Sequence, residues 1–504
     1  MPEIELKLAA RAADMPRLRR ALEAMAPGGK IASAKLVSTY YDTADRALAR
    51  RGWALRVRQH DGNFVQTVKS TGMVGDTPLA RGEWEDPVAS ALPDPRAGDS
   101  GRFLTPDIAD RLKPLFRTEV TRLVTELSPT TGVRIEAAID RGEICAPGKS
   151  PVERISEIEL ELKNGPVTAL YDLALQLLEV APLRFEQRSK ADRGYRLAAG
   201  GPSVATVRAR PFSLDPGLSA DAALQRIGVA CLDQAIRSED AIIAGQADAV
   251  HQMRVAIRRL RAALSGFRDI LPVEPRRWAS GELRWLAGVL GDARNLDVFD
   301  SVLLGPVRGM LPDARQLDAA LKRRRRAAYA AAGRAIRSPR YTALMLRLLR
   351  WFDSCGWREG DSATREPHRP IGEIAPKLLD QRRRAAKKAG KGFAGQSPED
   401  RHRLRIALKK LRYTGELLGG LYDPSRVHKF TERLKRLQDD LGHANDLRVG
   451  EAIVAELARN GANTGIMDAG RQVIDFHRHR VADLEPKVRK HLRRLLRTEP
   501  FWRR

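Results

Sequence analysis

The sequence contains few cysteines, few aromatic residues and no long apolar run. Three of its 504 residues are cysteine, far apart and without CxxC spacing, which argues against a disulfide framework and against a structural zinc site. We expect these thiols to be reduced. The apolar runs are short and interrupted by Arg or Glu, so no membrane-spanning helix is expected.

The beginning of the chain also lacks the pattern of a signal peptide. Met1–Lys7 includes two glutamates, where a signal peptide is basic and then apolar. We therefore expect a soluble protein inside the cell. With 43% apolar and 30% charged residues, the chain is too long for one compact domain and too evenly mixed for a disordered one. Two or three folded units are expected.

Acidic residues are outnumbered, chiefly in the second part of the chain. The sequence has 89 Lys and Arg against 63 Asp and Glu, a formal net charge of +26, which suggests a polyanionic partner. Residues 1–210 hold 32 basic and 28 acidic side chains, whereas residues 211–504 hold 57 and 35. Turn residues mark 201–216 as a linker between domains at 1–200 and 217–500.

Short runs in the first part alternate apolar and polar residues, which is typical of half-buried strands. Eight such segments occur, enough to close an antiparallel barrel. They are Ile4–Lys7, Val37–Asp42, Ala54–Arg58, Phe64–Lys69, Glu83–Glu85, Arg117–Glu126, Arg134–Glu136 and Glu157–Glu161. Helical patterns lie near Met15–Ala26 and Val167–Val180. We predict an eight-stranded antiparallel β tunnel with flanking helices.

One face of the predicted sheet is densely charged. Because side chains alternate along a strand, Glu3, Glu5 and Lys7 share one side. The same alternation groups Arg56 with Arg58, Glu83 with Glu85, and Glu157 with Glu159 and Glu161. Two interpretations are open. The charged face points into water while the opposite face forms an ordinary apolar core, or the charged face points inward and binds a hard divalent cation together with phosphate oxygens. Acidic pairs beside basic pairs favour the second interpretation.

The second part changes to apolar residues spaced by three and four, which predicts an all-helical domain. It also repeats itself. His251–Arg261 resembles His402–Arg412 at an offset of 151 residues, and the same offset returns in a leucine-containing block downstream. We therefore expect two duplicated helical-bundle units, at about 217–350 and 370–500.

Each copy carries a basic stripe. A histidine is followed by basic residues at offsets of three, seven and ten, which places all four on one side of a helix. Neighbouring like charges destabilise an isolated helix, so a bridging anion would recover the loss. A solvated charged face is the usual alternative, and the repetition argues against it. Neither stripe contains an aromatic residue, which argues against stacked nucleic-acid bases.

A segment similar to a phosphate-binding P-loop, Gly142–Ser150, fails in spacing and context. Five residues separate its glycines instead of four, and Pro151 and a strand pattern follow where a helix is required. We interpret this segment as a turn.

The strand segments carry a series of motifs in a specific order. The chain begins with Glu3-Ile4-Glu5-Leu6-Lys7, which is similar to an ExExK signature. Further motifs follow at Tyr40–Thr43, Leu55–Arg58, Lys69, Arg122, Glu157–Glu161 and Ser189–Tyr195. Over roughly residues 1–200 the chain resembles CYTH domains, the triphosphate tunnel metalloenzymes. The resemblance implies a tunnel that binds a triphosphate and hydrolyses its terminal phosphate with Mg²⁺ or Mn²⁺.

The resemblance also implies roles for individual residues. The metal ligands would be Glu3, Glu5, Glu157 and Glu159. The phosphate-binding residues would be Lys7, Arg56, Arg58, Lys69, Arg122 and Lys190. Glu136 and Asp140 have the parity of Arg134 and share its face. Each of the two is a candidate metal ligand, water-orienting base or salt-bridge partner.

The helical part resembles the CHAD domain over about residues 215–500. The resemblance rests on the two stripes and on the block Leu290–Asp297, and it implies binding of inorganic polyphosphate in a basic groove. The lining residues would be His251, Arg254, Arg258, Arg261, His402, Arg405, Lys409 and Arg412. The second copy differs from the first, because Lys409 replaces Arg258 and Asn445 replaces Arg294.

These features predict an inorganic triphosphatase whose helical domain captures polyphosphate near the tunnel. The alternatives are a non-catalytic protein that binds polyphosphate or nucleic acid, and a thiamine triphosphatase or adenylate cyclase on the same tunnel. Association with a polyphosphate-binding half favours an inorganic substrate. We expect cytoplasmic residence, with polyphosphate granules as one place of association.

Overall fold

The structure, a computed structural model, describes residues 3–70, 79–149, 152–201, 214–311, 314–358, 369–459, 464–482 and 484–503. The chain forms two compact units. The first is made of Met1–Ala205 with Arg337–Ser354, and the second of Thr206–Ile336 with Cys355–Arg504. The linker predicted at 201–216 lies mostly outside the described residues. The sequence did not indicate that a segment beyond residue 336 belongs to the first unit.

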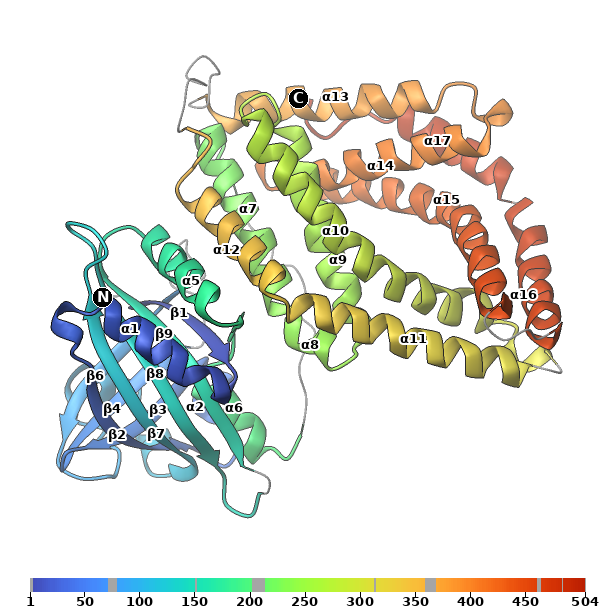
Figure 1. The fold of residues 1–504 in the computed structure, drawn as a ribbon. Helices are drawn as coiled ribbons and strands as arrows, with labels where there is room; N and C mark the ends of the chain where they lie inside the picture. The colour runs from blue at the N-terminus through green and yellow to red at the C-terminus, as the bar shows by residue number, and fades with distance from the viewer. Residues whose placement is uncertain are drawn as a thin grey trace. The chain divides into compact units, whose positions relative to one another are not determined.

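The first unit is built around an antiparallel β-sheet that nearly closes on itself (Figure 1). Within the described residues the strand order is β10-β1-β9-β8-β7-β2-β3-β4-β6, and β5 pairs with β1. Because only Gly82 separates β5 from β6, this pairing brings the edges of the sheet together. The strands are β1 (Glu3–Ala10), β2 (Ala32–Asp42), β3 (Trp53–His60), β4 (Asn63–Ser70), β5 (Ala80–Arg81), β6 (Glu83–Val88), β7 (Lys113–Leu127), β8 (Arg134–Cys145), β9 (Glu153–Asn164) and β10 (Leu183–Phe185).

The prediction of an antiparallel tunnel is confirmed, and each of the eight predicted segments lies in a strand. The two strands that the sequence did not reveal, β5 and β10, have two and three residues. Segments this short show no alternation. The P-loop-like segment continues β8 as far as Cys145 and then turns, where the amide of Lys149 donates to the carbonyl of Ala146 at 3.1 Å.

Helices cover the outer, apolar face of the sheet. On one side lie α1 (Met15–Met25), which buries Met15, Leu18 and Leu22 along one stripe, and α5 (Thr168–Val180). On another, Leu48 and Ile108 come from the short helices α2 (Ala47–Arg50) and α4 (Pro106–Ala109) and pack against sheet residues. The remaining helices of this unit are α3 (Gly98–Gly101), α6 (Lys190–Ala198) and α12 (Pro339–Asp353).

Helix α6 packs against the inner side of the sheet. Its N-terminus is fixed by a capping box, in which the Ser189 hydroxyl accepts from the Asp192 amide and the Ser189 amide donates to the Asp192 carboxylate, both at 3.0 Å. Gly194 lies so close to Phe116 that a Cβ atom would meet the ring at 2.0 Å. The Tyr195 hydroxyl donates to the buried Asp42 carboxylate at 3.0 Å.

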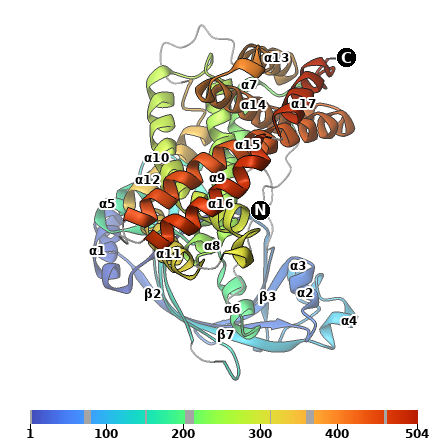
Figure 2. The same ribbon diagram turned by 90° about the vertical axis from the view of Figure 1, so that its right-hand side faces the viewer.

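The second unit is all-helical in its described residues, as predicted (Figure 2). Its helices are α7 (Ala220–Arg237), α8 (Glu239–Ile243), α9 (Ala247–Gly266), α10 (Val273–Val298), α11 (Ala314–Ile336), α13 (Ile371–Ala389), α14 (Pro398–Leu418), α15 (Pro424–Arg459), α16 (Thr464–Ala482) and α17 (Glu485–Arg497). Helices α13, α14 and α15 begin 151 residues after α7, α9 and α10 respectively. The predicted duplication requires this spacing.

None of the helices in the described residues has both the length and the apolar character needed to cross a bilayer. Cys145 and Cys231 form no disulfide.

The contact between α6 and the sheet leads to a stability prediction. Gly194→Ala should lower the free energy of unfolding by about 1–3 kcal/mol, because the added methyl group overpacks the Phe116 ring. Urea denaturation followed by circular dichroism measures this. The matched control is Gly201→Ala, where no atom lies within 4 Å of the new Cβ and the change should stay within about 0.5 kcal/mol. Equal stability of the two variants would contradict the close packing of α6.

Candidate functional site

The strand register brings acidic and basic side chains face to face. Residues directly opposite each other in an antiparallel pair point to the same side of the sheet. Lys7 of β1 lies opposite Glu159 of β9, and Arg122 of β7 lies opposite Asp140 of β8. Side chains from four strands therefore meet on the inner face, as the charged-face interpretation predicts.

Three of these side chains, Lys7, Arg122 and Glu159, line a partly enclosed cavity of about 310 Å³. The acidic residues along it are Glu3, Glu5, Glu83, Glu85, Glu136, Glu159, Glu161 and Glu186, and the basic ones are Lys7, Arg56, Arg58, Lys69, Arg81, Arg122, Lys163 and Lys190. The described lining therefore has as many cations as carboxylates. A polyanionic ligand would need additional positive charge to balance it.

Lys190, the first residue of α6, lies among three buried carboxylates. Its Nζ is 2.7 Å from Asp140 Oδ2, 2.6 Å from Glu157 Oε1 and 2.7 Å from Glu159 Oε1. Burial lowers the pKa of Lys190, but the three carboxylates outweigh burial and raise it above its usual value. The ammonium group therefore stays charged.

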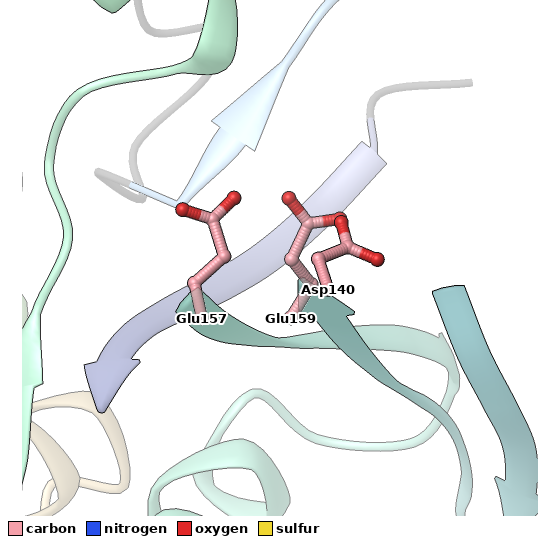
Figure 3. Close-up of side chains that lie close together, drawn as sticks. All are labelled: Asp140, Glu157 and Glu159. Atoms are coloured by element: carbon pink, nitrogen blue, oxygen red, sulfur yellow. The ribbon is translucent and has the colours of Figure 1, made fainter. Parts of the chain in front are cut away.

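The three carboxylates form a compact oxygen cluster. Asp140, Glu157 and Glu159 each offer an oxygen, and these atoms lie within 4.8 Å of one another (Figure 3). Arg122 reaches both Asp140 oxygens, at 2.8 and 2.6 Å, and also contacts Glu159. Burial raises the pKa of Glu159, but Lys190, Lys7 and Arg122 bring it well below the usual value. Glu159 is therefore ionised despite its burial, because basic partners surround it.

Glu5 and Lys7 lie beside this cluster on β1. Lys7 Nζ is 3.1 Å from Glu5 and 3.0 Å from Glu159. Burial, and then the charge of Glu159, raises the pKa of Glu5 to about 7. Glu3, two residues earlier, accepts from Lys69 Nζ at 2.8 Å. These two predicted metal ligands line the cavity without belonging to the three-carboxylate cluster.

Arg56 and Arg58 are less fully paired than Lys190. Arg56 Nη2 lies 3.5 and 3.4 Å from Glu83 and Glu85, and its Nε is buried without a partner in the described structure. Burial, and then Arg56, lowers the pKa of Arg58 to about 10. The polar contact of Arg58 is with Ser38 Oγ at 3.4 Å. These guanidinium groups are placed to bind an anion.

The remaining predicted residues and the missed ones differ in kind. Glu136 lines the cavity and lies 3.7 Å from Lys163, whereas Asp140 is fully buried beside Lys190.

Some charged residues of the site had no role in the sequence analysis. Arg193 pairs with Glu157 at 3.0 Å. Other lining residues without a predicted role are Arg81, Glu83, Glu85, Glu161, Lys163 and Glu186. The alternation placed Glu83, Glu85 and Glu161 on the charged face without giving them a role. Arg81 lies in a two-residue strand and Glu186 outside any strand, so alternation could not indicate them.

In the second unit, the two basic stripes face each other because α9 packs on α14. Arg258 of α9 and Arg412 of α14 lie over the same Tyr413 ring, at 5.4 and 4.9 Å from its centroid. We call the stripe residues together the basic ridge. Within the described residues, Arg254, Arg258 and Lys409 form no ion pair with a carboxylate.

Burial and mutual repulsion lower the pKa values along the basic ridge. Burial and then Arg294 bring the pKa of His251 to about 4, and burial and then Arg258 bring that of Arg254 to about 10. Burial and then Arg405 bring the pKa of Lys409 to about 7. The same causes lower the pKa values of Arg258, Arg261 and Arg405. His402 is exposed, and Arg412 pairs with Glu416 at 3.3 Å.

Comparison with known proteins assigns both parts of the chain. Residues 1–195 match the CYTH domain family, and residues 226–455 match the CHAD domain family. The chain carries a CYTH domain followed by a CHAD domain. The resemblance stated from the motifs is thereby confirmed.

Individual relatives match parts of the chain. An inorganic triphosphatase of Haemophilus influenzae is 34% identical over 167 residues, which are 32% of this chain and 46% of that protein. An uncharacterized protein of Mycobacterium tuberculosis is 29% identical over 282 residues, 53% of this chain and 51% of that one. The chain thus covers about half the length of these curated relatives. The crystal structure of the CHAD domain from the plant Ricinus communis is 28% identical, has a TM-score of 0.52, and corresponds to 57% of this chain and 96% of that one.

The position of Lys190 in the CYTH domain leads to a second prediction. Lys190→Met should lower the free energy of unfolding by about 3 kcal/mol, because three buried carboxylates lose their shared counterion. Added Mg²⁺ or Mn²⁺ should recover part of this loss by binding among them. Denaturation with and without the metal measures both effects.

Lys163→Met serves as the control for this comparison. Lys163 lies on the same cavity but is more exposed and pairs with Glu161, so its removal should cost at most about 1 kcal/mol. If the two variants lose the same stability and respond alike to metal, the charge balance assigned to Lys190 is wrong.

Proposed function

We propose that the CYTH domain hydrolyses inorganic triphosphate with the help of a divalent cation, and that the CHAD domain binds inorganic polyphosphate. The first proposal is carried by the partly enclosed cavity, which is lined by Glu159 of the buried carboxylate cluster and by incompletely paired arginines. It is supported by the similarity to an inorganic triphosphatase. Phosphoryl transfer depends more on positioned cations than on a nucleophilic side chain. The arginines and lysines of the cavity are such cations.

The carboxylate cluster supplies ligand atoms that suit a hard divalent cation, which would have to displace the Lys190 ammonium group from among them. Asp140, Glu157 and Glu159 offer three carboxylate oxygens within 4.8 Å of one another, and Mg²⁺ and Mn²⁺ prefer such ligands. Glu3 and Glu5 are further candidates from the same cavity. A cation held there would neutralise phosphate oxygens and lower the pKa of bound water.

The basic residues of the cavity would bind and orient the phosphate chain. Arg56, Arg58 and Lys69 approach it from two adjacent strands, and Arg58 gains most because no carboxylate pairs with it in the described structure. Asp140 accepts from both Arg122 and Lys190, so we assign it to ion pairing and metal binding. Glu136, which faces the cavity with one distant partner, is the better candidate for orienting the attacking water.

The lining of the cavity favours an inorganic substrate over a nucleotide or thiamine compound. Among its described residues the one aromatic side chain is Tyr40. That ring already stacks on Phe116 at a centroid distance of 4.5 Å. Among the described lining residues, a purine or thiazolium ring would therefore find one aromatic side chain, already stacked on a neighbour.

An assay of phosphate release tests the triphosphatase proposal. Wild-type protein with Mg²⁺ or Mn²⁺ should hydrolyse tripolyphosphate faster than ATP or thiamine triphosphate. Arg58→Met should lower kcat/KM by about a hundredfold, because a buried donor aimed at the phosphate is lost. Since Arg58 balances no carboxylate, the variant should keep its fold.

The matched control is Arg134→Met, an exposed arginine at the start of β8 that pairs with Glu126. It should keep wild-type turnover. Absence of tripolyphosphate hydrolysis in the wild type, or equal turnover in Arg58→Met, would contradict the proposal.

The basic ridge supports the polyphosphate proposal. Neighbouring cations lower one another's pKa values because their charges repel. A bound polyanion would offset this repulsion and stabilise the charged forms. The side chains that face Lys409 are Arg405 and Arg412 on its own helix and Arg254 and Arg258 on α9. Arg405 Nε is buried without a partner in the described structure. A chain of phosphates could bridge these groups.

Polyphosphate binding should weaken as pH rises. The pKa of Lys409 is near 7 in the free protein, so this side chain loses its charge above that pH and binds the anion less well. Titration with long-chain polyphosphate at pH 6 and pH 8.5 should show this loss in the wild type, and Lys409→Arg should reduce it. Lys435→Arg, on the exposed surface of α15, should behave like the wild type. An unchanged pH dependence in Lys409→Arg would contradict the assignment.

A further inference from the structure

Helix α12 lies in the CHAD match by its position in the sequence, but it packs with the CYTH tunnel. It lies within the stretch 226–455 that matches the CHAD family. Yet residues Arg337–Ser354 form one compact unit with the tunnel, where α12 packs along α5 and against β10 (Figures 1 and 2). The last helix of the predicted second repeat, α17, packs instead on α15 within the helical unit.

The sequence of α5 explains why this helix needs a cover. Its buried residues are Leu170, Tyr171, Leu173, Ala174 and Leu177. They form a wide apolar face, and α5 contacts α1, β9 and α12. Helix α12 has a wide apolar face of its own, and its buried residues include Leu344, Leu348 and Phe352.

Polar contacts fix how α12 lies on the tunnel. The Thr342 hydroxyl donates to the carbonyl of Leu183 at 2.7 Å in a buried position. The Tyr171 hydroxyl donates to Asp353 at 2.7 Å. Arg350 pairs with Asp172 at 2.5 Å, with both side chains about half exposed. The bond from Thr342 to Leu183 matters for the candidate site, because Leu183 is the first residue of β10.

Strand β10 leads directly into the active-site residues. It pairs with β1, with Ala10 opposite Leu183 and Leu8 opposite Phe185. The amide of Glu186, the next residue, donates to the carbonyl of Lys7 at 2.9 Å. Four residues later Lys190 enters the carboxylate cluster. The position of β10 thus sets where Lys7 and Lys190 lie relative to each other.

We propose that α12 is a positioning element of the triphosphatase site, and that Thr342 is its positioning residue. By holding Leu183, the Thr342 hydroxyl keeps β10 on β1 and so keeps Lys190 among its carboxylates. Turnover in the tunnel therefore depends on a helix encoded more than 130 residues beyond the end of the CYTH match. This inference rests on the proposed triphosphatase function.

The test uses full-length protein with Thr342→Val, which keeps the side-chain shape and removes the donor. Hydrogen exchange at the amides of Arg184 and Glu186, which face β1, should become faster. The kcat for tripolyphosphate should fall roughly tenfold with KM little changed, because catalysis is sensitive to small displacements of positioned groups. Thr342→Ser retains the hydroxyl and should restore both. Polyphosphate binding should be unchanged in both variants.

Arg350→Gln is the matched control, because it alters the same helix face at an exposed ion pair and should leave exchange and kcat at wild-type values. Should Thr342→Val fail to fold, Tyr171→Phe removes a single oxygen at the same interface and should change exchange and kcat in the same direction. Wild-type kcat in these variants, or lower kcat without faster exchange in β10, would overturn the proposal. If the wild type does not turn over tripolyphosphate, the proposed function is contradicted instead. Hydrogen exchange in β10 would still show whether α12 holds that strand.

Discussion

The tunnel depends on the pairing of Lys190 with three buried carboxylates. An unpaired charge in this environment would be costly, and so would an unbalanced group of carboxylates. The pairing requires α6 to dock deeply, which the close contact of Gly194 with Phe116 and the bond from Tyr195 to Asp42 make possible. The nearly closed sheet then keeps water from replacing these partners.

The two domains handle charge in opposite ways. In the CYTH domain acidic and basic side chains balance one another, so an anionic substrate can enter only with added cations. In the CHAD domain Arg254, Arg258 and Lys409 form no ion pair with a carboxylate in the described structure, and their pKa values are lowered first by burial and then by repulsion from neighbouring cations. A polyanion alone would relieve it. Under the proposed function, the tunnel would use a metal ion for catalysis and the helical domain would bind polyphosphate without one.

Helix α12 shows that a sequence domain and a packed unit need not coincide. The apolar face of α5 contacts α12 in addition to α1 and β9. The chain thus supplies part of the cover of the tunnel unit from the stretch that matches the CHAD family.

The sequence by itself determined the strands, the charged face and the switch to helices, because alternation and three-to-four spacing are local properties of the chain. It placed Glu5, Lys7 and Arg58 on the cavity side correctly. Tertiary structure alone decided that Asp140 joins Glu157 and Glu159, that β5 and β10 complete the sheet, and that α12 belongs with the tunnel. These features depend on strand register and on contacts between residues far apart in sequence, which leave no periodic pattern behind.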